Sequence, residues 1–466
     1  MTSAPVTYPP RPVVDRLTLP PGPRELPIVG QTFQYMWNPI RFMEKAATYG
    51  DLVTLSTKPA LVYLVNHPDL IRDVIITNHQ KVDRGPNTEV MKLLTGNGLI
   101  TATGTDHLRQ RRLIQPSLQR ARIERYAETM QSYAESHQGN WADGQRVDLG
   151  RELSLLTLRI VVKTLFGTEL ADEVRRIGAA FALSNSYITT RANQPPRMRK
   201  LFHRLPLPYS VRFKRARADL DEIIYALIAE RRDSPKQGED LLSLLMEAHF
   251  ADEDGESSGA GLTDEQVRDE TVTMFAAGHE TTAVTLIWTC YLLATHPELQ
   301  ARFHAELDRV IGDRAATLDD LPNLTFMDQA LAEALRLYPP IWFWGRMAFE
   351  PFELGGYHIP AGAFILAPQL IAQRDPRFFD AALEFRPDRW TGEFRANLPQ
   401  FAYFPFGGGP RRCIGEGFAM MEAKLILATI GRRWAMRHDP RHKPEALPLI
   451  SLRPKGGMPM FLERRG

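Results

Sequence analysis

Apolar residues recur at helical spacing along most of the chain, so the pattern predicts a mainly helical protein. The clearest helix begins at Thr263, which stands at capping-box spacing from Gln266, and its apolar run continues to the pair His296–Pro297. A shorter helix is predicted in NPIRFMEKAATYG, where Asn38 suits the cap and Gly50 suits the stop. The long apolar run predicts that the helix after Thr263 is mostly buried.

Strand patterns are fewer than helical ones. Alternating residues at 51–57 and 61–65 predict one hairpin, and glycine turns within 352–367 predict further strands. Residues 448–465 alternate enough to predict a last hairpin.

Three stretches lack a regular pattern. Residues 1–30 are proline-rich, which predicts an extended arm leading into the fold. Residues 191–217 mix basic, proline and aromatic residues and predict an irregular loop, which is either a solvated basic face or a segment that acts as a substrate lid or touches a membrane peripherally. Residues 251–261 are acidic and rich in glycine and serine, which predicts a surface connection.

The composition excludes several classes of protein. With 44% hydrophobic and 24% charged residues among 466, the chain can bury a large core, and its net charge of +2 does not favour nucleic acid as a partner. The two cysteines, Cys290 and Cys413, exclude a secreted disulfide framework and favour a reducing compartment. Residues 1–30 contain no signal-peptide run and no membrane-spanning stretch, so we expect a soluble cytoplasmic protein without a transmembrane anchor.

A glycine-rich stretch leads into Cys413 and is followed by a helical pattern in FPFGGGPRRCIGEGFAMMEAKLILATIGRRW. A helix start and the neighbouring Arg411 and Arg412 each lower the pKa of a thiol, so the sequence predicts a thiolate. The glycines would let the backbone approach a flat, bulky group, which Phe406 would shield. A zinc site is excluded because no second cysteine lies near Cys413, and His279–Glu280 lack the second histidine of a zinc protease motif.

Phe406, Gly409, Arg411, Cys413 and Gly415 match the pattern F-x-x-G-x-R-x-C-x-G, and through them the chain resembles the cytochrome P450 family. The resemblance implies heme b (iron protoporphyrin IX), with Cys413 as the iron ligand and Phe406, Arg411 and Gly415 as cofactor-binding residues. A thiolate ligand pushes electron density onto iron and favours cleavage of the O–O bond.

The segment AGHETT (277–282) interrupts the long apolar helix with an acid and two hydroxyls, which is costly in a buried helix unless they are used. It matches the family's oxygen-binding segment, so the resemblance implies that Glu280 and Thr281 relay protons with the help of water. In the alternative, Glu280 pairs with a basic neighbour and the threonines bond back to the helix. We expect His279 to be a packed core residue rather than an iron ligand.

Two further sets of residues match family motifs. An E-x-x-R match and a later arginine imply a buried structural network of Glu333, Arg336 and Arg389. The family's W-x-x-x-R helix, with histidine in place of tryptophan, and an arginine that follows two prolines imply contacts to the haem propionates from His107, Arg111 and Arg346.

These matches extend over nearly the whole chain. The resemblance therefore implies a single haem domain over residues 31–466, mostly α with a small β-rich lobe, in the cytochrome P450 fold. The chain ends soon after the haem segment and has no cysteine cluster for an iron–sulfur centre, so we expect electrons from a separate ferredoxin or flavodoxin with its reductase.

The resemblance also implies a pocket whose residues are mostly apolar: Leu94, Phe275, Ala276, Ala277, Trp342, Phe343 and Met458. Core packing is an equal alternative for Trp342, Phe343 and the neighbouring Trp344. It predicts a monooxygenase that uses O2 to hydroxylate a hydrophobic small molecule, a terpenoid or carotenoid first and a fatty acid next. Two alternatives stay open. One is a haem-thiolate peroxygenase, and the other is a haem-binding sensor that is not an enzyme.

Overall fold

The structure is a computed structural model, and it describes residues 8–10, 12, 19–24, 31–58, 60–85, 88–169, 173–192, 194, 205, 207–233, 240–247, 249–251 and 257–465. Contacts divide the chain into two compact units. The first unit contains Met1–Thr88 and Ala332–Cys413, and the second contains Glu89–Leu331 and Ile414–Gly466.

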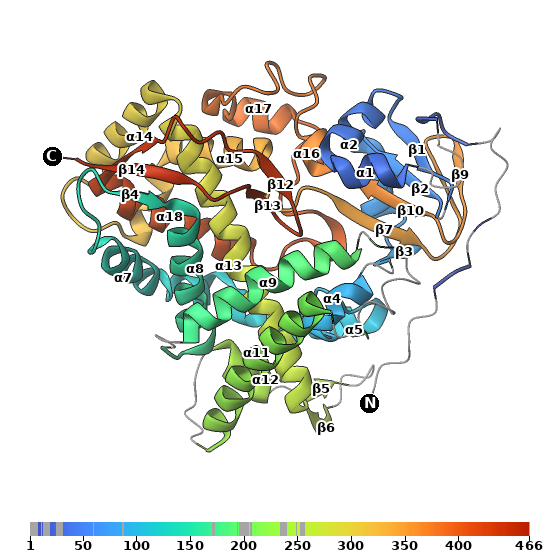
Figure 1. Cartoon of the computed structure of the whole chain (residues 1–466), viewed down its shortest axis with the longest axis horizontal. Helices are drawn as coiled ribbons and strands as arrows, with labels where there is room; N and C mark the ends of the chain where they lie inside the picture. The colour runs from blue at the N-terminus through green and yellow to red at the C-terminus, as the bar shows by residue number, and fades with distance from the viewer. Residues whose placement is uncertain are drawn as a thin grey trace. The chain divides into compact units, whose positions relative to one another are not determined.

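The first unit is built on a five-stranded sheet with the strand order β1-β2-β10-β7-β3 (Figure 1). Its strands are β1 (Leu52–Ser56), β2 (Val62–Val65), β3 (Val82–Asp83), β7 (Trp344–Ala348) and β10 (Phe364–Ala367), and a separate hairpin joins β8 (Phe352–Leu354) to β9 (Tyr357–Ile359). Its short helices are α1 (Thr32–Trp37), α2 (Pro39–Ala47), α3 (Pro68–Arg72), α16 (Gln369–Ala372) and α17 (Gly392–Asn397).

The sheet is stabilised by apolar contacts among β-branched and aromatic side chains, which form the core of this unit. Tyr63, Val65 and Ile365 are completely buried and pack with Ile71 and Val74 from the α3 region. β1 and β2 are antiparallel, so the predicted hairpin is confirmed, whereas β10 joins β2 in parallel.

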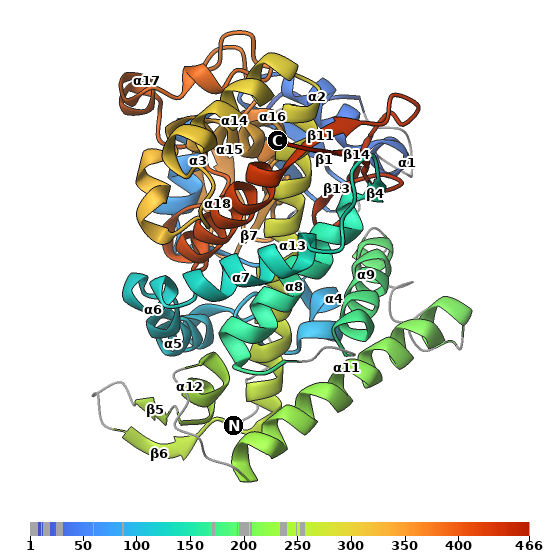
Figure 2. The ribbon, with the colours of Figure 1, turned by 90° about the vertical axis from the view of Figure 1, so that its left-hand side faces the viewer.

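The second unit is mostly helical (Figure 2). Its helices are α4 (Thr88–Thr95), α5 (Gly104–Ile114), α6 (Arg120–Glu124), α7 (Ala127–Gln138), α8 (Leu149–Phe166), α9 (Glu173–Ala192), α11 (Pro208–Asp233), α12 (Leu241–Glu247), α13 (Asp264–Ala294), α14 (Pro297–Val310), α15 (Thr325–Leu337), whose residues from Ala332 on belong to the first unit, and α18 (Glu416–Arg433). Its strands are β4 (Arg146–Asp148), β5 (His249–Ala251), β6 (Ser257–Gly261), β11 (Trp434–His438), β12 (Ala446–Pro448), β13 (Leu452–Pro454) and β14 (Pro459–Arg464).

Helix α13 is the central element of the second unit, where it packs along α8 and also contacts α11, α14 and α18 (Figures 1 and 2). Its N-terminus has the predicted capping box, because Thr263 and Gln266 each bond to the other's backbone N–H. The side chain of Asn38 likewise accepts a hydrogen bond from the backbone N–H of Arg41 at the start of α2. Both predicted helix starts are confirmed, and so is the mainly helical class.

Three predictions of irregular or paired structure need correction. The predicted hairpin at 448–465 is wrong, because β12 pairs with β13 while β14 lies between β11 and β4. Residues 208–217 belong to α11 rather than to a loop, since their three arginines and one lysine favour helix and Phe213 supplies a buried face. Residues 257–261 form β6.

The N-terminal arm lies largely outside the described residues, as do 195–204 of the predicted loop and 252–256 of the predicted connection. Where the arm is described, it is attached to the sheet. The backbone N–H of Thr54 donates to the carbonyl of Pro21 at 2.9 Å, and its hydroxyl donates to Pro20 at 2.8 Å. Among the described residues, no helix has the length and apolar content needed to cross a bilayer.

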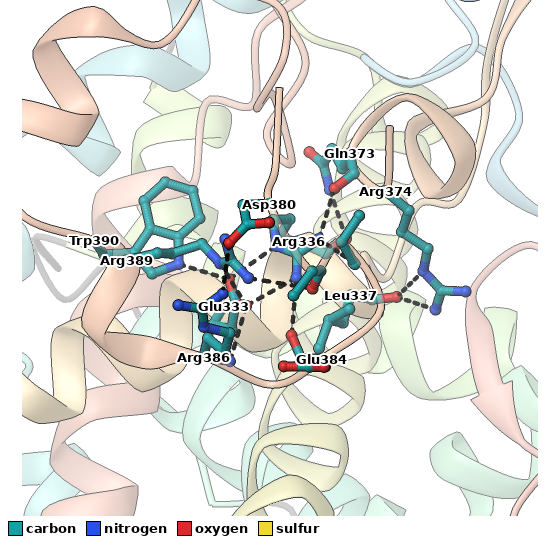
Figure 3. Close-up of polar contacts among 12 residues, drawn as sticks. Glu333, Arg336, Leu337, Gln373, Arg374, Asp380, Glu384, Arg386, Arg389 and Trp390 are labelled. Atoms are coloured by element: carbon teal, nitrogen blue, oxygen red, sulfur yellow. Dashed lines mark hydrogen bonds and ion pairs between the residues drawn. The ribbon is translucent and has the colours of Figure 1, made fainter. Parts of the chain in front are cut away.

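The first unit also contains a buried network around the carboxylate of Glu333 (Figure 3). Arg336 donates to both carboxylate oxygens at 2.8 Å, and neither side chain has any exposed surface. Arg389 and the indole N–H of Trp390 donate at 2.9 Å, and the backbone N–H of Arg386 donates at 3.0 Å. The remaining donors of Arg336 bond to backbone carbonyls of residues 373, 382 and 384. The three residues that the resemblance grouped therefore do form one network.

We expect Glu333→Gln to lose about 3–5 kcal/mol of unfolding free energy, because it leaves the buried charge of Arg336 without its carboxylate. Denaturant unfolding would measure this loss. Arg386→Ala is a matched control that removes only the exposed pair with Asp380 and keeps the backbone bond to Glu333. Equal stability of Glu333→Gln and the parent protein would show that the network is dispensable.

Candidate functional site

Cys413 follows a tight, glycine-dependent loop in the first unit. Gly409 has a φ of 62°, and a Cβ there would lie 2.6 Å from the carbonyl oxygen of Ile75, so only glycine fits. The backbone N–H of Cys413 donates to the carbonyl of the half-buried Phe406 at 2.9 Å, and the side chain of Cys413 is exposed. Helix α18 begins at Glu416 with Gly415 as its N-cap, so the helix starts slightly later than the sequence pattern suggested.

Three arginines gather near this loop in the first unit. Arg411 forms an ion pair with Asp83 at 2.6 Å, and Arg346 is buried with its guanidinium stacked 4.1 Å from the ring centroid of Trp344. Burial, together with Arg84 and Arg411, holds the pKa of Arg346 well below its usual value. Burial and Arg411 likewise lower the pKa of Arg84 to about 10, although Asp83 opposes the change.

Among the described residues, the charges of this cluster do not balance. Asp83 is the acid that acts on Arg84, Arg346 and Arg411 together, and the buried Nε of Arg84 makes no hydrogen bond within the described residues. Buried cations that repel one another are stabilised when an anion is added. The cluster is therefore suited to a ligand with more than one acidic group. Sequence reasoning missed Arg84, since no motif marks it.

The other predicted cofactor contacts lie in the second unit on α5. His107 and Arg111 stand one turn apart on this helix, with His107 buried and Arg111 half-buried. Residues four apart share one face of a helix, so both can address the same partner. Whether that partner is the cofactor stays a prediction.

Glu280 is buried in α13 and accepts several hydrogen bonds. The donors are Nε of Arg453 at 2.7 Å, the hydroxyl of Ser451 and the side-chain amide of Asn185. The hydroxyl of Thr281 donates to the carbonyl of Ala277 at 2.8 Å. Both features of the alternative reading, a basic partner and back-bonded threonines, are therefore present. They do not decide whether these groups also move protons.

The residues around Glu280 pack α13 against its neighbours. A Cβ on Gly278 would lie 3.1 Å from a methyl group of Val161 on α8, so a small residue allows this close approach. His279 is buried, its ring lies 5.2 Å from that of Phe181, and its Nδ1 is hydrogen-bonded to the carbonyl of Phe275. Burial lowers the pKa of His279. The expectation of a packed core histidine is confirmed.

Sequence reasoning also missed Glu422, which lies on α18 with no exposed surface. Neither of its carboxyl oxygens has a hydrogen-bond partner by geometry within the described residues. Burial raises the pKa of Glu422 well above its usual value, and the neighbouring hydroxyl of Thr282 opposes this rise. The position of Glu422 in an otherwise apolar run was the available signal.

The predicted pocket residues differ in their surroundings. Phe275 is completely buried against Phe166, with 4.3 Å between ring centroids, which is the packing of a core residue. Trp342 is also buried, and Phe343 meets it edge to face at 4.6 Å. The others are buried or half-buried in the second unit: Leu94, Ala276, Ala277 and Met458. Their contact with a substrate stays a prediction.

Comparison with known proteins gives a consistent result. The sequence model of the family described as Cytochrome P450 matches residues 20–461. "Cyclooctatin synthase" of Streptomyces melanosporofaciens is 37% identical, with 94% of each chain covered. "Pentalenene oxygenase" of Streptomyces avermitilis is 36% identical over 90% of this chain and 91% of its own. "Cyclooctat-9-en-7-ol 5-monooxygenase" of Streptomyces melanosporofaciens is 35% identical over 90% of each chain.

Among solved structures, the heme domain of cytochrome P450DA superposes with a TM-score of 0.84 at 27% identity, covering 96% of this chain and 98% of that one. The fold and the loop that leads into Cys413 define a haem-thiolate oxygenase. The chain belongs to the cytochrome P450 family and is a haem-dependent monooxygenase. The predicted fold class, mostly α with a small β-rich lobe, is confirmed.

The residues present fit a haem. A haem carries two carboxylates, and these match the excess positive charge of Arg84, Arg346 and Arg411. Cys413 lies on a loop that requires glycine at position 409. Its exposed thiol is suited to bind iron from one side.

We expect Arg84→Gln to lose haem about tenfold faster, because one charge-assisted hydrogen bond to a haem carboxylate is removed. Haem transfer to an excess of apomyoglobin would measure this rate. The apoprotein should be no less stable, since the substitution relieves repulsion among the arginines. Arg72→Gln, which removes an exposed arginine of the same unit, is the control. Haem loss that is as slow as in the parent protein would exclude Arg84 from the cofactor site.

Glu422 should make stability depend on pH. Because its pKa is raised in the folded state, the unfolded chain releases the proton first, and stability falls as the pH rises above about 4.5. Glu422→Gln should flatten this decline between about pH 5 and pH 8. Urea unfolding across that range checks the prediction, with the exposed Glu445→Gln as control. Identical profiles for Glu422→Gln and the parent protein would mean that Glu422 ionises normally.

Proposed function

We propose that this cytochrome P450 hydroxylates an apolar terpenoid in the cytoplasm, with heme b as its cofactor and a separate ferredoxin or flavodoxin, with its reductase, as the electron donor. The observation that carries the proposal is the match to relatives named for pentalenene and cyclooctat-9-en-7-ol over 90% of this chain. The mostly apolar side chains at the predicted pocket positions, such as Leu94, Phe275 and Trp342, support it.

Each group of residues has a distinct role in this proposal. When bound, the haem supplies the iron chemistry that activates O2. Cys413 would bind the iron through its thiolate, and Phe406 and Gly415 would be further cofactor-binding residues. Arg84, Arg346 and Arg411 would hold the haem carboxylates. His107 and Arg111 of α5 are cofactor-binding residues in the same proposal.

In this proposal, Glu280 and Thr281 hold and move protons through the carboxyl group of Glu280 and the hydroxyl of Thr281. The hydroxyl of Thr281 can turn from the carbonyl of Ala277 to a water or to oxygen, which makes it a movable donor. Glu280 first has to give up a hydrogen bond, and Arg453 is the partner best able to leave, since its side chain is 26% exposed. Release of Arg453 would then accompany proton delivery.

The test is turnover of pentalenene and related cyclic terpenes by the purified holoprotein with a surrogate ferredoxin, its reductase and NADPH. A monohydroxylated product is expected, together with the red-shifted Soret band of a thiolate haem when the reduced protein binds carbon monoxide. Cys413→Ala should lose that band. Thr281→Ala should keep it but divert about tenfold more reducing equivalents to hydrogen peroxide. Oxidation of fatty acids in place of terpenes, or tight coupling in Thr281→Ala, would contradict the proposal.

A further inference from the structure

Three consecutive charged residues of α13 are buried near its N-terminal end. Arg268 is 2% exposed, Asp269 is 7% exposed and Glu270 is 2% exposed. Buried charges are destabilising unless they are paired and hydrogen-bonded. None of the roles assigned above to α13 uses these residues, so their partners are informative.

On one side, Arg268 connects α13 to α11, which packs against it (Figure 2). Its Nε donates to a carboxylate oxygen of Asp221 at 2.7 Å, and Nη2 donates to the same oxygen. Its Nη1 donates to Asp269 at 2.9 Å. One buried guanidinium therefore joins an acid of α11 to an acid of α13.

On the other side, the two acids of α13 hold the turn at 96–99. The second oxygen of Asp269 accepts from the backbone N–H of Asn97 at 2.7 Å, and Glu270 accepts from that of Leu99 at 3.0 Å. A Cβ on Gly98 would lie 2.1 Å from the hydroxyl of Thr273, so the backbone of the turn lies directly against α13. Asp221, Arg268, Asp269 and Asn97 thus form one continuous polar chain.

We propose that Arg268 is a positioning residue that makes the turn at 96–99 follow the position of α11. The importance of this coupling for the reaction rests on the proposed function, because the turn comes directly after Leu94 of the predicted substrate pocket. Through this chain, a shift of α11 is transmitted to the turn, which controls how closely the turn contacts a terpenoid.

Loss of Asp221 should weaken the turn even though the two do not touch. Without Asp221, two donor groups of Arg268 lose their acceptor in a buried place, so the guanidinium has to turn toward water. Asp269 then loses its cation. Because burial already raises the pKa of Asp269, this carboxyl is less able to stay ionised, and it holds the N–H of Asn97 more weakly.

The experiment is hydrogen–deuterium exchange of the ligand-free holoprotein, followed in peptides that cover residues 95–101 and 215–225. Asp221→Asn should speed exchange in 95–101 by about tenfold, the scale of one hydrogen bond to a charged group. Asp221→Glu keeps the charge and should restore slow exchange. The Soret band of the carbon monoxide complex should be the same in all variants, which confirms folded holoprotein.

Two matched controls separate this coupling from general loosening. Arg232→Gln removes an exposed ion pair with Asp264 that joins the same two helices. Arg217→Gln removes the other cation near Asp221, 3.5 Å away on α11 itself. Neither should change exchange in 95–101.

The proposal is wrong if Asp221→Asn speeds exchange in 215–225 while 95–101 stays as slow as in the parent protein. In that case Asp269 and Glu270 hold the turn without help from α11. If Asp221→Asn does not fold, Arg268→Lys takes its place, and an unchanged rate in 95–101 again overturns the proposal. These measurements need no substrate, so a failure of terpenoid hydroxylation would leave their result standing.

Discussion

Buried charge is the constraint on which this structure depends. Around Glu333 the charges are fully matched, since Arg336, Arg389 and Trp390 all donate to one carboxylate and the spare donors of Arg336 reach backbone carbonyls. Such a network is complete without a ligand. The arginine cluster near Cys413 differs because Asp83 faces three cations and, within the part of the chain that the structure describes, the Nε of Arg84 has no acceptor. Charge balance therefore distinguishes the structural network around Glu333 from the candidate cofactor site near Cys413.

Helix α13 is mostly apolar but carries two groups of polar residues. Each group binds a different neighbouring segment of the chain. Near its start, Arg268, Asp269 and Glu270 hold α11 and the turn at 96–99. Farther along, Glu280 holds the segment of Ser451 and Arg453. A residue that binds a neighbouring segment while facing a reaction site links the chemistry to the motion of that segment. The same helix thus both organises the second unit and carries the candidate catalytic groups.

Sequence patterns identified those parts of the protein that depend on local rules. The capping box at Thr263 and the cap at Asn38 follow from side chains a few residues apart, so they could be read directly. The F-x-x-G-x-R-x-C-x-G motif could be recognised in the sequence because its backbone accepts only glycine at position 409. By contrast, the pairing of β14 with β11 and β4, and the approach of Arg84 to Arg346, depend on residues far apart in the chain. No local pattern encodes such contacts.

The alternatives for Glu280 illustrate the same limit, and the structure changes how they relate. From the sequence, an ion pair and a proton relay looked like rival explanations for one buried acid. In the proposed function, with Arg453 as a half-exposed partner, the two are successive states of one group, because an acid held by a movable cation is both ordered and releasable. Release of the cation would then set when the carboxyl exchanges a proton. Under that proposal, charge matching and catalysis are two uses of a single contact.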